Sequence, residues 1–127
     1  MTKFTWEHIH LRSPDPEATA TWYKDKLGAE IIRTPQAGGG IRLDLDLSGQ
    51  KIFIALAQPG KAADAPHSPY LGLDHFGLTV DDIDAAVAEL KAKGVTFTMD
   101  PTVNRPGVKI AFLTAPQNVS IELIQRG

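Results

Sequence analysis

The strongest constraint on how this chain can fold is an internal repeat that relates its two halves. When the sequence is shifted by 67 residues, so that His8 meets His75, residues 8–58 align with residues 75–125 without a gap. Eleven of the 51 aligned positions are identical, whereas average composition gives roughly three by chance. Neither half is long enough to bury a stable core alone. The repeat therefore predicts two similar modules that pack together as a pseudo-symmetric pair.

Each half shows the same predicted order of elements: a strand, a helix and three further strands. Asp15 and Pro16 signal the start of a helix that ends before Gly28, and Asp82 signals a second helix that ends before Gly94. Runs of alternating or continuous apolar residues predict the strands. These strands are 5–11, 29–34, 41–47 and 51–57 in the first half and 73–80, 95–99, 108–114 and 119–125 in the second, with a turn-rich loop at 100–107.

This pattern predicts an α+β fold in which two βαβββ modules pack as a pseudo-symmetric pair around a concave metal site. The expected organisation is a single domain, 1–127, with module one at about 5–58 and module two at about 72–127. The segment at about 59–71 between them is rich in Pro, Gly, Ala and Ser, which is typical of a linker.

Composition excludes several classes of protein. The formal net charge is −2 and Lys and Arg do not cluster, so a nucleic-acid partner is not expected. No apolar run approaches the roughly 18–20 residues of a membrane span, and the first residues lack the apolar region of a signal peptide. These features predict a soluble, cytoplasmic protein. The absence of cysteine excludes disulfides, thiolate metal sites and a cysteine nucleophile.

Strand alternation predicts which side chains face the concave surface. Glu122 stands between Ile121 and Leu123, and these apolar neighbours are expected to lie under a helix, which turns Glu122 to the opposite face. The same alternation in the first strand of each half turns His8 and His75 to that face. Three side chains from three strands are therefore expected on one surface.

The residue types of this set point to a metal. Two imidazoles and one carboxylate on one side of a divalent cation leave coordination positions open, as in non-haem Fe(II) oxygenases. We therefore predict His8, His75 and Glu122 as metal ligands, with Ala55 at the fourth symmetric position. The alternative for each His is a hydrogen-bonded structural residue. A carboxylate between two apolar neighbours is harder to explain in that way, because burying it unpaired costs several kcal/mol.

Other polar residues are candidates for roles around the metal. His10 shares a strand face with His8 and is a candidate acid or base. Tyr70 and Arg12 could contact substrate at the mouth of the cavity. His67 lies in the linker and is expected to be exposed, and Asp44 and Asp46 are expected on a solvated strand face.

At these residues the sequence resembles the vicinal oxygen chelate superfamily, which contains glyoxalase I, methylmalonyl-CoA epimerase, extradiol dioxygenases and the bleomycin and fosfomycin resistance proteins. The motifs are His8-x-x-Leu11 with Asp15, Trp22-Tyr23-x-x-x-Leu27-Gly28, Asp74-His75-x-x-Leu78-x-Val80-Asp81-Asp82 and Ile121-Glu122-Leu123. The resemblance covers nearly the whole chain. It implies paired βαβββ modules around a divalent metal, often in a dimer, with ligands at His8, His75 and Glu122.

The resemblance also bears on the type of reaction. Glyoxalase I and the epimerases have Glu or Gln where Ala55 is assigned, and a methyl group cannot bind a metal. Arg12 matches the cavity-mouth arginine of the glyoxalases. Extradiol dioxygenases use only the three ligands that this chain retains. They also have a tyrosine ten residues before the Glu, where Phe112 stands; Phe112 is therefore a predicted substrate contact, and His10, His67 or Tyr70 would have to transfer the proton.

The sequence thus predicts a metal-dependent enzyme of dioxygenase type that acts on a small chelating organic substrate. Fe(II) or Mn(II) is the expected metal, with Ni, Zn or Co as alternatives. A glyoxalase- or epimerase-type lyase or isomerase is the second hypothesis, and a non-catalytic small-molecule binding protein is the third. We expect a homodimer.

Overall fold

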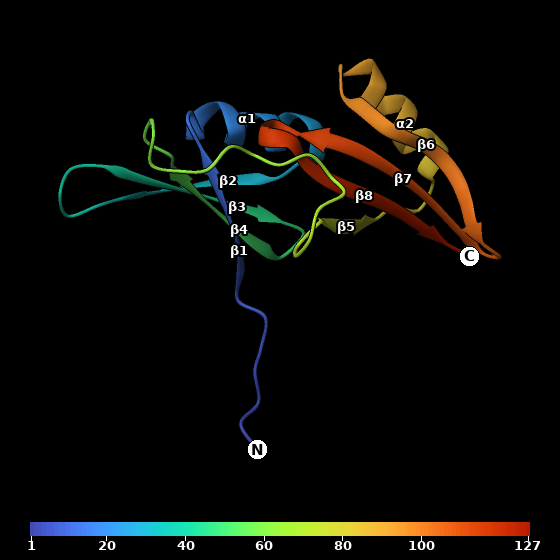
Figure 1. Ribbon diagram of the computed structural model, residues 1–127, viewed down its shortest axis with the longest axis horizontal. Coiled ribbons are helices and arrows are strands. Elements are labelled where there is room, and N and C mark those ends of the chain that lie inside the picture. Colours follow the sequence, from blue (N-terminus) through green and yellow to red (C-terminus); the bar gives the residue numbers. More distant parts are fainter. The chain divides into compact units, whose positions relative to one another are not determined.

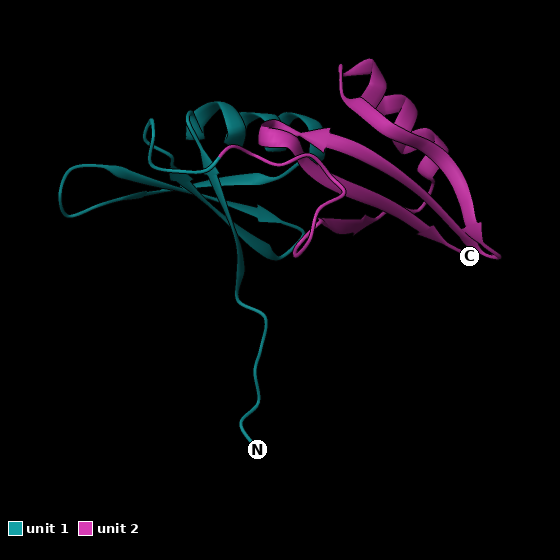
Figure 2. Ribbon diagram, viewed as in Figure 1, with its two compact units in different colours: residues 1–63 teal, residues 64–127 magenta.

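The computed structural model describes residues 1–127 and divides into two compact units, residues 1–63 and 64–127 (Figure 2). Each unit contains one module and is described by itself. The boundary falls in the stretch 57–74, which contains no helix or strand. No helix in the chain is long and apolar enough to span a membrane.

Module one contains one helix and a four-stranded sheet (Figure 1). The strand order is β1-β4-β3-β2, in which β1 runs parallel to β4 and the other pairs are antiparallel. The elements are β1 (His8–Ser13), α1 (Pro16–Leu27), β2 (Glu30–Pro35), β3 (Ile41–Leu47) and β4 (Gln50–Leu56).

Local sequence signals account for the ends of α1 and for the β3–β4 turn. The Asp15 carboxylate accepts a hydrogen bond from the backbone N–H of Ala18 at 3.1 Å, as expected of an N-cap. Gly28 ends the helix with φ of 74°, in the left-handed region. Ser48 and Gly49 both have positive φ, 52° and 88°, which matches the two-residue turn between the strands.

Module two repeats this architecture. Its strand order, β5-β8-β7-β6, has the same pattern of parallel and antiparallel pairs. Asp82 caps α2, and the side chain of Gln125 on β8 accepts a hydrogen bond from the N–H of Ile83 at 2.8 Å. The elements are β5 (His75–Thr79), α2 (Ile83–Ala92), β6 (Thr96–Arg105), β7 (Val108–Ala115), η1 (Pro116–Asn118) and β8 (Val119–Arg126).

The predicted α+β fold with two βαβββ modules is confirmed, and the predicted boundaries differ most from the observed ones at two places. The first strand begins at His8 rather than residue 5. The loop predicted at 100–107 is largely strand, because β6 continues to Arg105 through register shifts that accommodate Pro101. The turn is thereby reduced to Pro106 and Gly107.

Each sheet buries the residues on one face. In β8 the buried residues are Ile121 and Leu123, and in β4 they are Ile52 and Ile54, while the intervening side chains are only partly covered. The helices contribute further buried residues. These are Thr19, Ala20 and Tyr23 from α1 and Ile83, Val87 and Leu90 from α2.

Tyr23 gives a testable prediction about the core of module one. Its side chain is fully buried and its hydroxyl has no hydrogen-bond partner, and burial raises the pKa of the phenol well above its ordinary value. A buried hydroxyl without a partner retains its desolvation cost. We expect Tyr23→Phe to increase the free energy of unfolding by about 1 kcal/mol in urea denaturation. A decrease of that size would show that the hydroxyl has a partner.

Candidate functional site

His75 and Glu122 meet on one face of the sheet in module two. Parallel pairing of β5 with β8 sets His75 opposite Ser120 and Gly77 opposite Glu122. The His75 Nε2 atom lies 3.5 Å from Glu122 Oε1. A Cβ atom added at Gly77 would lie 3.6 Å from the same oxygen, so the absence of a side chain leaves room for the carboxylate. The predicted pairing of His75 with Glu122 on one face is thus what the strand register produces.

The orientation of the His75 ring is set by Asp74. His75 Nδ1 lies 2.8 Å from Asp74 Oδ2. The Asp74 carboxylate also accepts hydrogen bonds from the Ser68 hydroxyl, at 2.8 and 2.9 Å, and from the Tyr70 backbone N–H at 3.1 Å. The hydrogen bond with His75, followed by that from Ser68, holds the pKa of the Asp74 carboxyl below its usual value. An ionised carboxylate accepts a hydrogen bond from Nδ1–H, which favours the tautomer whose Nε2 carries a lone pair.

This arrangement fits a metal ligand pair. Nε2 of His75 faces the Glu122 carboxylate, which accepts no hydrogen bond from any other group, and the two side chains are 33% and 21% exposed. Two partly buried acceptors directed at each other favour a cation between them. A carboxylate on the remote nitrogen of a metal-binding His is the usual way of fixing its ring and tautomer. Neither unit by itself groups three His, Asp or Glu side chains in metal-binding positions.

In module one His8 lies against an aromatic ring. The imidazole of His8 stacks on Phe53 with a centroid separation of 4.0 Å and an interplanar angle of 22°. His10 is farther from both, with centroids 6.1 Å from His8 and 6.3 Å from Phe53. The guanidinium carbon of Arg42 lies 4.2 Å from the Phe53 centroid. Because β1 and β3 run in opposite directions on either side of β4, His8 and Arg42 approach the ring from opposite ends of β4.

The register of module one identifies the residue in the place of Glu122. In module two Glu122 lies opposite Gly77, which is two residues after His75 on β5. Two residues after His8 is His10, and its partner on β4 is Phe53. Phe53 therefore holds the fourth symmetric position, and the assignment of Ala55 to it is wrong. The fourth position still lacks a metal donor, because a phenyl ring is no better a ligand than a methyl group.

Two single-residue insertions account for this difference. Module two joins β7 to β8 by the three residues 116–118, whereas module one joins β3 to β4 by the two residues 48–49. The pairing of β3 and β7 with the last strands shows that the other extra residue of module two lies before β7. The ungapped alignment is consequently out of register by two residues in the last strand. A shift of two residues preserves the face of every side chain. The predicted face of Glu122 was therefore correct although its partner in the repeat was misassigned.

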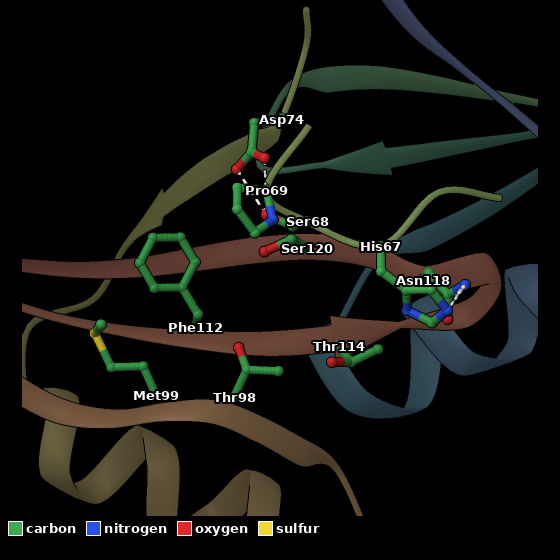
Figure 3. Close-up of a pocket in the computed structure, with 10 residues that line it drawn as sticks. All are labelled: His67, Ser68, Pro69, Asp74, Thr98, Met99, Phe112, Thr114, Asn118 and Ser120. Carbon is green, nitrogen blue, oxygen red and sulfur yellow. Dashed lines mark hydrogen bonds between the residues drawn. The ribbon is translucent and has the colours of Figure 1, made fainter. Parts of the chain in front are cut away.

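A cavity of about 400 Å³ lies on the same face of module two (Figure 3). Phe112 lies directly opposite Glu122 on β7, and its ring contacts the His75 ring edge-on at 4.9 Å. Phe112 forms the floor of this cavity, so the cavity lies next to the two candidate ligands, His75 and Glu122. Further lining residues are His67, Thr98, Met99, Thr114 and Asn118.

The remaining predicted residues lie at different places. The His67 side chain is exposed, as expected, but it lines the cavity of Figure 3, where its Nε2 lies 3.4 Å from the Asn118 amide. Tyr70 is 39% exposed, and its backbone rather than its phenol contacts Asp74. Arg12 is exposed on the same strand face as His10.

Asp44 does not lie on a freely solvated face. Its side chain is 14% exposed and pairs with Arg42, with Nε to Oδ2 at 2.9 Å. It is opposite Phe53 on the neighbouring strand. The expectation that this carboxylate is solvated was therefore wrong, since cross-strand neighbours cover it.

A family model matches residues 5–123, which is most of the chain and both modules. It describes the Glyoxalase/Bleomycin resistance protein/Dioxygenase superfamily. The chain belongs to this superfamily. The predicted resemblance to the vicinal oxygen chelate proteins is confirmed by this match.

Three relatives illustrate the range of the superfamily around this chain. The uncharacterized protein YwkD of Bacillus subtilis (strain 168) is 28% identical over 121 residues, covering 94% of each chain. The mitochondrial methylmalonyl-CoA epimerase of Mus musculus is 29% identical over 116 residues, covering 84% of this chain and 63% of the epimerase. The crystal structure of a glyoxalase family protein from Enterococcus faecalis superposes with a TM-score of 0.72 and 26% identity, covering 95% of this chain and 97% of that one.

Two residues beside the candidate ligands, one in each module, were not predicted from the sequence. Asp74 was noticed only as part of a motif, although a carboxylate directly before a candidate ligand His is itself a signal. Phe53 was not identified because the ungapped alignment of the two halves pairs Ala55 with Glu122. No sequence signal singled out Phe53, because Ile52-Phe53-Ile54 and Ile54-Ala55-Leu56 both place a central residue between branched apolar ones, as Ile121-Glu122-Leu123 does.

Proposed function

We propose that this protein is a divalent-metal-dependent enzyme whose ligands are His8, His75 and Glu122. Its substrate would be a small organic molecule that chelates the metal, and its chemistry would be of dioxygenase type. The observation that carries the proposal is the chain of contacts in module two, in which Asp74 orients His75 so that its free nitrogen faces the Glu122 carboxylate.

His8 is proposed as the third ligand on two grounds. It occupies in module one the place that His75 holds in module two, at the start of the first strand. Its ring is held by stacking on Phe53 rather than by a carboxylate at Nδ1, where the nearest partner is Glu7 Oε1 at 3.6 Å. Stacking restrains the plane of the imidazole while leaving its nitrogens available.

The absence of a fourth donor favours dioxygenase-type chemistry. Phe53 occupies in module one the position that Glu122 occupies in module two. Only three protein ligands would therefore hold the metal, which would leave coordination positions open for substrate and O₂. When bound, Fe(II) or Mn(II) supplies Lewis acidity and redox chemistry, whereas Ni, Zn or Co supplies the Lewis acidity that a lyase or isomerase needs.

The surrounding residues would bind the substrate and move its protons. We propose His10 as an acid or base, because it lies on the same strand face as His8 and forms no hydrogen bond of its own. Phe112 would contact the substrate body from the floor of the module-two cavity. Arg12 and Tyr70 are exposed in their own modules, and we propose that they contact the substrate.

A lyase or epimerase is the second candidate, favoured by the similarity to the mouse methylmalonyl-CoA epimerase. Such a reaction needs a base that removes a proton next to a carbonyl group. Phe53 cannot serve as that base, so His10 would have to do so.

Metal analysis and two activity assays test these alternatives. Protein purified without a chelator is expected to contain about one equivalent of divalent metal per chain. Oxygen uptake with a panel of catechols is expected, and turnover of a methylglyoxal–glutathione adduct is not. The opposite pair of results would favour the lyase, and protein that neither retains nor takes up metal would contradict both readings.

A further inference from the structure

A second cavity, of about 410 Å³, lies in module one on the sheet face that carries His10. Arg42, Phe53 and Ala55 also line it from that face. We propose that this cavity binds a carboxylate of a small molecule with an apolar body, and that Arg42 is the residue that recognises the carboxylate. This inference deepens the proposed function by naming a substrate class, and it rests on that function for the claim that the bound molecule is the substrate.

The guanidinium of Arg42 is held in place before any ligand arrives. Its Nε atom lies 2.9 Å and 3.2 Å from the two carboxylate oxygens of Asp44. Its central carbon lies over the Phe53 ring, 4.2 Å from the ring centroid. Both contacts restrict a long side chain that would otherwise lose rotamer entropy on binding.

The donors that remain on Arg42 suit a carboxylate. Asp44 occupies only the Nε atom, and the two terminal amino groups form no hydrogen bond, while the side chain as a whole is 46% exposed. Two parallel N–H donors in a rigid plane match the two oxygens of a carboxylate. Asp44 is already paired, so it holds the fork in place without using the two groups that a ligand would contact.

The apolar part of the ligand is indicated by Phe53 and Ala55, which line the cavity from the face of β4 that alternates with the buried Ile52 and Ile54. A ligand that places its carboxylate on Arg42 and its apolar body against these two side chains would cover apolar surface that is only partly buried. The cavity volume is in the usual range for small-molecule sites.

The probes for this proposal are 4-fluorobenzoate and its neutral analogue 4-fluorobenzamide. Their binding to metal-stripped protein is measured by ¹⁹F NMR titration. We expect 4-fluorobenzoate to bind and Arg42→Gln to weaken its binding by about 10- to 100-fold, the effect of losing hydrogen bonds to a charged group. The double variant Arg42→Gln, Asp44→Asn keeps the net charge and leaves no unpaired carboxylate, and it should lose the same affinity. Arg42→Lys should also bind weakly, because an ammonium lacks the fork.

The matched control is Arg33→Gln. Arg33 belongs to the same module, is 49% exposed and is also paired with a carboxylate, Glu17, at 2.8 Å. Its loss should leave 4-fluorobenzoate binding unchanged. Equal effects of the Arg33 and Arg42 variants, or equal affinity for the benzamide, would overturn the proposal. Arg42-dependent binding in a protein that takes up no metal would support the carboxylate site while contradicting the proposed function, and metal uptake without Arg42-dependent binding would do the reverse.

Discussion

Replacing Glu122 with alanine is expected to weaken metal binding by more than about 100-fold and to abolish metal-dependent activity. The carboxylate is the one anionic donor of the proposed set, and its partner His75 Nε2 lies 3.5 Å away. His75→Ala should have an effect of similar size, because it removes the other donor of the pair. Both effects are measured by metal analysis after gel filtration and by calorimetric titration of stripped protein with Zn²⁺ or Mn²⁺.

Two control variants define the specificity of that result. Glu30→Ala removes the same charge from an exposed position on β2 and should retain full metal affinity. His10→Ala should retain the metal as well, because its counterpart in module two is Gly77, which is no ligand. Loss of metal from His10→Ala alone would show that the wrong histidine of β1 was chosen.

Asp74→Asn is expected to lower metal affinity by about 10- to 100-fold without removing any proposed ligand. An amide can turn its NH₂ group toward His75 Nδ1, which would favour the tautomer that carries its proton on Nε2 and so blocks the ligand atom. The substitution also removes the carboxylate that Ser68 and the Tyr70 backbone hold. Calorimetric titration with metal measures the loss, and circular dichroism checks that the fold is intact.

Asp81→Asn is the matched control for Asp74→Asn. Asp81 is exposed in the same module and immediately precedes the N-cap of α2. Its substitution removes the same charge and should leave metal affinity unchanged. If the two variants were equally impaired, the effect would be one of net charge, and Asp74 would have no role in orienting His75.

Much of the candidate site could be predicted because side-chain alternation survives errors of register. The assignment of Ala55 to the fourth position was wrong by two residues, yet the face assigned to Glu122 agrees with its contact to His75. What could not be predicted was the consequence of two extra residues in module two, one before β7 and one in the turn before β8. The residue opposite a given histidine depends on hydrogen bonding between strands that are far apart in the sequence.

The loop before β5 shows the same limit. Its composition predicted a linker with an exposed His67, and that side chain is exposed. The contacts that the loop makes with its own module, through Ser68 to Asp74 and through Asn118 to the Ala65 carbonyl oxygen, were not predicted. Such contacts join residues that no periodic pattern relates.

The sequence alone determined the repeat, the two βαβββ modules, the capped helices and the face of each strand, because these depend on local spacing and on which residues prefer to be buried. Only the tertiary structure decided that Phe53 rather than Ala55 stands in the place of Glu122, that Asp74 orients His75, and that Asp44 and Phe53 hold Arg42 in a fixed position. Each of these depends on a distance across strands or between a loop and a sheet. Such distances are set by the packing of the whole module rather than by any short stretch of chain.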